Sequence, residues 1–185
     1  MIKLFSIVYL TIGLFANTAG IHDYTVPLIE GGTQQLSAYS NKRLYIVTLP
    51  VAQSAAADSL LYSLDTLASA HQATHKVIAV PAFEDGFTTD QKTVLQQWYR
   101  SKLGNYVLIT DGMYTRKSSG SQQHVLFQWL TKSVNNQIFD AEVEGPGHQF
   151  FVMPDGKLYG ILQAQFGVGS SVANKVLTAP QQTGE

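Results

Sequence analysis

Two short apolar runs, each closed by a proline, constrain the fold of this chain more than any other feature. Residues 43–49 (RLYIVTL) are rich in β-branched and aromatic side chains and end before Pro50. Residues 77–80 (VIAV) form a second apolar run, which ends before Pro81. Runs of this length and composition, stopped by proline, are typical of buried strands. The sequence therefore predicts two core strands separated by about one helix.

The rest of the chain continues an alternation of strands and helices. Leucines at helical spacing after Asp58 predict the first helix, and a Pro-Asp-Gly turn at residues 154–156 predicts a hairpin. The predicted helices cover residues 59–67, 88–99, 122–131 and a last short segment capped by Ser170 or Ser171. The further predicted strands cover residues 24–29, 106–109, 150–153 and 157–162. This order indicates an α/β protein whose sheet is covered by helices on its faces.

The first twenty residues have the pattern of a secretory signal peptide. Lys3 precedes an apolar run from Leu4 to Phe15, and small residues follow as far as Gly20. The run is shorter than the roughly 20 apolar residues that span a bilayer as a helix. We predict that residues 1–20 are a signal peptide, that residues 21–185 form one domain, and that the protein is exported, either periplasmic or secreted. The alternatives are a buried first helix or an uncleaved anchor, and only the anchor would attach the protein to a membrane.

The charge balance and the lack of cysteine exclude several classes of function. The chain has 12 Lys and Arg against 13 Asp and Glu, which gives a formal net charge of -1. Nucleic acids and anionic surfaces bind clustered positive charge, so we expect no nucleic-acid partner. The chain has no cysteine, which excludes disulfides, thiolate metal sites and every mechanism with a cysteine nucleophile. We also predict no cofactor.

Several stretches resemble glutathione peroxidases and related thioredoxin-fold peroxidases. They are residues 21–26 (IHDYTV), 36–39 (LSAY), 42–47 (KRLYIV), 77–81 (VIAVP) with Gly86, and 150–157 (FFVMPDGK). Together they extend the resemblance over most of residues 21–177. The resemblance implies a thioredoxin-like three-layer sandwich with a central mixed sheet. It also implies oxidative-stress chemistry, in which a cysteine or selenocysteine reduces a peroxide.

The positions that match the family's catalytic residues carry none of its chemistry. The nucleophile would fall among Gln53, Ser54 and Ala55. The family's Gln matches Glu84, and its Trp-Asn pair matches Gly145 and Pro146. A serine hydroxyl lacks the acidity and redox capacity of a thiolate, a Glu adds negative charge, and Gly-Pro offers no side-chain donor. The resemblance therefore predicts a degenerate member that keeps the fold and has lost the peroxidase chemistry.

Glu84, Asp85 and His148 are the candidate binding residues. We predict that they lie at the former active-site groove, which would hold a protein or small-molecule ligand of unknown identity. A carboxylate beside a histidine can do acid–base work, but no positioned nucleophile accompanies it, so a solvated loop is the expected place for His148. A nominal triad of Ser54, Asp58 and His148 lacks the Gly-x-Ser-x-Gly context of a hydrolase.

Two further groups have ordinary structural interpretations. His71 and His75 have the i, i+4 spacing of metal ligands on a helix, but no third ligand accompanies them, so we expect surface or capping roles and no metal. Arg116 and Lys117 lie in a stretch rich in Ser and Gly, which indicates a solvated connection rather than an anion site.

Two functions remain open at this point. The first is an exported, non-catalytic binding protein. The alternative is a residual peroxidase-type enzyme of the same family that works by chemistry not visible in the sequence.

Overall fold

A mixed five-stranded sheet lies at the centre of the computed structural model, which describes residues 20–180. Its strands follow the order β5-β4-β3-β6-β7. The central strand β3 pairs in parallel with β4 and antiparallel with β6, while β5 and β7 form the two edges. The strands are β3 (Arg43–Leu49), β4 (His75–Pro81), β5 (Val107–Ile109), β6 (Gln149–Val152) and β7 (Leu158–Leu162).

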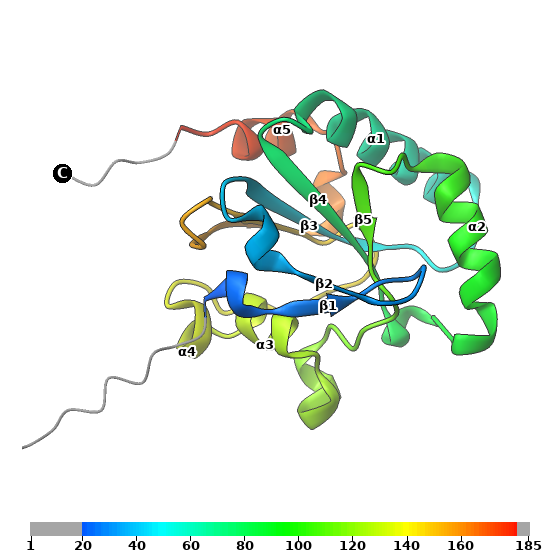
Figure 1. The fold of residues 1–185 in the computed structure, drawn as a ribbon, viewed down its shortest axis with the longest axis horizontal. Coiled ribbons are helices and arrows are strands. Elements are labelled where there is room, and N and C mark those ends of the chain that lie inside the picture. The colour runs from blue at the N-terminus through cyan, green and yellow to red at the C-terminus, as the bar shows by residue number, and fades with distance from the viewer. Residues whose placement is uncertain (1–19, 181–185) are drawn as a thin grey trace, which may run out of the picture.

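Helices cover both faces of this sheet (Figure 1). One face carries α1 (Ala55–His71), α2 (Lys92–Lys102) and α5 (Ser171–Leu177). The other carries α3 (Val125–Thr131), α4 (Ser133–Asn136) and the hairpin of β1 (Thr25–Pro27) and β2 (Thr33–Gln35). The predicted α/β class, a three-layer sandwich around a mixed sheet, is confirmed.

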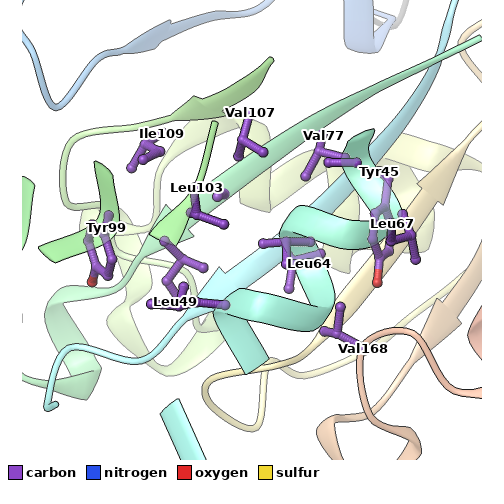
Figure 2. Packing of buried hydrophobic residues seen from close by; sticks show 14 of the residues in the cluster. Tyr45, Leu49, Leu64, Leu67, Val77, Tyr99, Leu103, Val107, Ile109 and Val168 are labelled. Atoms are coloured by element: carbon purple, nitrogen blue, oxygen red, sulfur yellow. The ribbon is translucent and has the colours of Figure 1, made fainter. Parts of the chain in front are cut away.

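Alternation along β3 builds the two cores. Tyr45 and Val47 face α1 and α2, whereas Leu44 and Ile46 face α3, because successive side chains of a strand point to opposite faces. Figure 2 shows Leu64 and Leu67 of α1 in the same cluster as Tyr45. Because both faces of β3 are buried, its sequence is a continuous apolar run, and such a run predicts a core strand.

The helix boundaries differ from those predicted. α1 begins at Ala55 rather than after Asp58, because the Ser54 side chain caps it by accepting a hydrogen bond from the Ala57 N–H at 3.1 Å. α2 begins at Lys92, after a 3-10 turn at residues 89–91, and Thr88 makes no side-chain cap. Residues 117–122 form a 3-10 helix, so α3 begins only at Val125.

The predicted signal peptide lies almost wholly in residues 1–19, outside the described residues, and stays a prediction. Between residues 20 and 180, no helix has the length and apolar content needed to cross a bilayer.

Candidate binding pocket at the N-terminus of helix α1

A pocket of about 330 Å³ opens where β3 ends and α1 begins. Its lining comes from three separate stretches of the chain. These are the β3–α1 connection with the first turns of α1, the turn after β4, and the segment before β6. The lining residues are Pro50, Val51, Ala52, Ser54, Ala56, Ala57, Leu60, Asp85 and Pro146. Apart from Ser54 and Asp85, every side chain in this set is apolar.

Thr48 at the end of β3 fixes the segment before β6. Its hydroxyl donates to the Gly145 carbonyl oxygen at 2.6 Å and accepts from the His148 N–H at 2.9 Å. Its backbone carbonyl oxygen accepts from the Gly147 N–H at 2.8 Å. Thr48 is fully buried, so these bonds are shielded from water. They hold Pro146 at the pocket, opposite the start of α1.

Gly147 lets this segment approach α1 closely. Its φ of +89° lies in the left-handed region, where side chains are strained. A Cβ at this position would come within 3.3 Å of the Leu60 Cδ1 atom. Glycine at position 147 therefore serves both the turn and the contact with α1.

Asp85 is the carboxylate of the pocket, and Arg116 pairs with it. The Arg116 Nη2 atom lies 2.5 Å from the Asp85 Oδ1 atom, while Oδ2 finds no hydrogen-bond partner among residues 20–180. The Asp85 side chain is only 8% exposed. Burial raises the pKa of Asp85, the Arg116 charge opposes that rise, and the Glu84 charge adds to it. The sequence predicted Arg116 as a solvated loop cation, and that interpretation is wrong.

Glu84 is turned toward the segment after β5, and it is absent from the pocket lining. Its Oε1 atom accepts from the N–H groups of Thr115 and Arg116, each at 2.8 Å, and from the Ser119 hydroxyl at 2.7 Å. These bonds tie the 3-10 turn after β4 to residues 115–119. Glu84 therefore orders the segment that delivers Arg116 to Asp85.

His148 is the last residue of the segment before β6, and only 1% of its surface is exposed. Its ring packs on Phe150, with centroids 4.9 Å apart, and neither ring nitrogen has a hydrogen-bond partner within the described chain. Burial lowers its pKa to about 4. The expectation of a solvated loop histidine is wrong, because alternation along the strand places His148 on the same face as Phe150.

The positions that the resemblance aligns with the family's catalytic residues lie at or near the pocket. Gln53, Ser54 and Ala55 are exposed before and at the start of α1, and Ser54 serves as its cap. Gly145 is buried against Arg116 and Asp85, and Pro146 lines the pocket. Asp58 belongs to another network, where it accepts from the Trp98 Nε1 atom at 2.9 Å and from the Lys102 Nζ atom at 3.0 Å. The nominal Ser54–Asp58–His148 triad therefore does not form.

The remaining candidates lie away from the pocket. His71 ends α1, whereas His75 begins β4, so the two do not share a helix face, although their rings lie edge to face with centroids 5.2 Å apart. His75 is buried and lies 3.1 Å, through its Nε2 atom, from the Leu177 carbonyl oxygen, so the expectation of a surface role is wrong for His75. Among residues 20–180 no group of three or more potential ligands is arranged to hold a metal. Lys117 pairs with Asp140 at 2.5 Å, so the second cation of the segment after β5 is also engaged.

No protein-family model matches the chain, and neither does any curated protein. Solved structures do match it. Trgpx in its apo form is 16% identical, with a TM-score of 0.64 over 87% of this chain and 95% of that one. T. cruzi GPX1 is 13% identical, with a TM-score of 0.58 over 86% and 95%. The fold is thioredoxin-like.

A third similar structure comes from outside the peroxidases. It is a secreted disulfide oxidoreductase of Mycobacterium tuberculosis homologous to E. coli DsbE, 12% identical with a TM-score of 0.52, over 84% of this chain and 96% of that one. The structural neighbours are thus glutathione-peroxidase-like and thioredoxin-like oxidoreductases, whereas this chain has no cysteine. At such low identities the similarity establishes the fold and leaves the chemistry to the residues present.

Proposed function

We propose that this thioredoxin-like chain is an exported, non-catalytic binding protein that holds its ligand in the pocket at the N-terminus of α1. The observation that carries the proposal is the residue content of this pocket. Where the resemblance places a redox nucleophile, the chain has an alanine-rich helix start capped by Ser54. Peroxide reduction needs a soft, ionisable and oxidisable centre, and neither Ser54 nor Asp85 provides one.

The volume, composition and hydrogen bonding of the pocket support a role in ligand binding. Its volume falls at the lower end of the range of roughly 300–1,000 Å³ that is usual for small-molecule sites. Apolar walls with a few fixed polar groups are the usual composition of such sites. Thr48, Glu84 and Arg116 each make buried or half-buried hydrogen bonds that hold the lining in place.

The test is peroxide consumption by purified protein, with glutathione or thioredoxin as reductant. We expect no turnover above buffer. The matched control is the Ser54→Cys variant, in which a thiolate at a helix N-terminus can attack hydrogen peroxide to give a sulfenic acid and hydroxide. We expect one thiol per chain to be oxidised, which shows that peroxide reaches the pocket. A wild-type rate that scales with protein and survives removal of contaminating metal would refute the non-catalytic role and favour the residual-enzyme alternative.

Export is tested by the intact mass of protein recovered from fractions of its native host. We expect a mass that lacks about 20 residues, in a soluble extracytoplasmic fraction. A full-length mass in the membrane fraction would make residues 1–20 an anchor. A full-length mass in the cytosol would refute export, and the binding proposal would then stand without it.

A further inference from the structure

The backbone of residues 144–148, directly before β6, is attached to the rest of the fold through one residue, Thr48. The N–H of Gly147 donates to the Thr48 carbonyl oxygen at 2.8 Å, and the N–H of His148 donates to the Thr48 hydroxyl at 2.9 Å. The Gly145 carbonyl oxygen accepts from that hydroxyl at 2.6 Å, and the His148 carbonyl oxygen accepts from the Thr48 N–H at 3.0 Å. No other described residue outside the segment hydrogen-bonds its backbone. Contacts with Thr48 therefore decide whether this segment stays closed on the pocket.

Few side-chain contacts hold the segment besides the His148 ring. Pro146 is exposed, and the exposed Glu144 accepts one hydrogen bond, from Gln163. The His148 ring is buried on Phe150, and neither of its nitrogen atoms has a hydrogen-bond partner among residues 20–180. Segments with few buried apolar contacts open locally at a lower free energy than that of unfolding the whole domain. The segment therefore meets the conditions for local opening.

The closed segment keeps the His148 ring neutral, whereas an open one lets it take up a proton. A buried ring without an acceptor disfavours the imidazolium, and water around an open segment removes that penalty. The strands and the helix packed on this side of the sheet supply no compensating charge, because residues 44–49, 77–81 and 125–131 contain no Asp, Glu, Lys or Arg. His124, directly before α3, is the nearest titratable group along that helix. Opening of the segment is thus coupled to proton uptake.

The charged groups near the segment are Glu142, Asp85 and Arg116. The Glu142 charge opposes the effect of burial on His148, and even so the pKa of the ring is lowered to about 4. A Cβ at Gly145 would lie 3.9 Å from both the Asp85 Oδ1 atom and the Arg116 Nη2 atom. Burial raises the pKa of Asp85, so acid also weakens the Asp85–Arg116 pair beside the segment. Only Glu142 resists opening by acid, and it does so in part.

We infer that residues 144–148 are a gate of the pocket, which opens without unfolding of the domain and takes up a proton on His148 as it opens. Opening carries Pro146 away from the start of α1 and so removes one wall of the pocket. Such a gate is a property of the chain itself and goes beyond the binding role proposed above.

The experiment is native-state hydrogen exchange of 15N-labelled protein between pH 7 and pH 5, with protection factors corrected for the intrinsic exchange rates. The N–H groups of Thr48, Gly147 and His148 report the gate, because each donates a bond that opening breaks. Those of Tyr45 and Ile46, in the central strand β3, report unfolding of the domain. We expect the gate to be less protected than the central strand at every pH. Its protection should also be unchanged in about 1 M urea, which lowers that of the central strand.

The size of the pH dependence follows from His148. With a pKa of about 4 in the closed segment and near 6.5 in the open one, the opening equilibrium rises about 20-fold between pH 7 and pH 5. The protection factors of the gate should fall by the same factor, and His148→Leu should abolish this fall. The matched control is His124→Asn, which removes another histidine whose pKa is lowered by burial and keeps a side chain that can cap α3. The gate of this control should keep the wild-type fall.

Three results would overturn the gate. Equal protection of the gate and the central strand would mean that the segment opens only when the domain unfolds. Protection of the gate that does not change with pH, or that falls equally in wild-type protein and His148→Leu, would remove the role of His148. If His148→Leu does not fold, the urea and pH series of the wild-type protein still decide the matter. Peroxide turnover by the wild-type protein would instead overturn the proposed function and leave the gate in place.

Discussion

Acidification should destabilise this protein through one buried histidine, His148. The side chain is 1% exposed and both ring nitrogens lack partners among the described residues, so the folded protein holds the ring neutral. Burial lowers the pKa of His148 to about 4, and the carboxylate of Glu142 opposes that shift only in part. In the unfolded chain the same ring has an ordinary pKa near 6.5.

The direction of the effect follows from proton binding in the two states. Between pH 6.5 and pH 4 the unfolded chain takes up a proton on His148 that the folded chain refuses. Stability from this group is therefore present above pH 6.5 and falls as the pH falls toward 4. With these two pKa values, the free energy of unfolding falls by about 3 kcal/mol between pH 7 and pH 4. About 2 kcal/mol of this fall occurs between pH 7 and pH 5.

The assay is urea unfolding, followed by tryptophan fluorescence, at several pH values between 7 and 4.5. The His148→Leu variant replaces the ring by an apolar side chain of similar volume and removes the proton. Burial also lowers the pKa values of His75 and His124, but both proteins keep those residues, so the difference between the two pH profiles isolates His148. We expect the wild-type protein to lose about 2 kcal/mol more than the variant between pH 7 and pH 5. Parallel profiles would refute a buried, neutral and unpartnered His148.

Three further substitutions probe the same region. Ser54→Ala removes the cap of α1 and should lower the free energy of unfolding by about 1 kcal/mol in urea unfolding, with Ser170→Ala, the equivalent cap of α5, as the comparison. Thr48→Val keeps the shape but removes two buried hydrogen bonds, so we expect a loss of about 2 kcal/mol and faster hydrogen exchange of the segment before β6. Arg116→Gln removes the partner of Asp85 and should lower the free energy of unfolding by about 2 kcal/mol at pH 7. This is less than the loss of a fully buried pair would cost, because Arg116 is partly exposed. The Arg116→Gln loss should shrink as the pH falls through the raised pKa of Asp85, and a loss independent of pH would contradict that pairing.

The sequence predicts the sheet well because local patterns determine its strands. β3 and β4 are apolar runs buried on both faces, and β6 and β7 flank an Asp-Gly turn in which Gly156 adopts a φ of +84°. These features depend on residues close together in the chain. The leucine spacing predicts a later start for α1 than the structure shows, because the leucines begin only in the second turn of the helix. The Ser54 cap before an alanine-rich run is the local signal that marks the true start.

The candidate site was only partly predictable, because its pairs are distant in sequence. Asp85 and Arg116 are 31 residues apart, and Thr48 lies 97 residues from the Gly145 carbonyl oxygen that it binds. No local pattern indicates that Glu84 turns away from the pocket while Asp85 lines it. The sequence does carry a signal for the burial of His148, since His148 precedes the buried Phe150 by two residues and alternation places both on one face. The predicted strand begins only at Phe150 and therefore leaves His148 in a loop.

The central claim is that a thioredoxin-like chain without cysteine binds a ligand where a peroxidase would reduce one. Its most direct test is peroxide consumption by the native host's own extracytoplasmic extract, before and after this protein is removed with an antibody. The extract contains the host's reductants, so it also covers chemistry that purified glutathione or thioredoxin would miss. The account predicts the same rate in both samples. A rate that falls on depletion and returns when purified wild-type protein is added would contradict it.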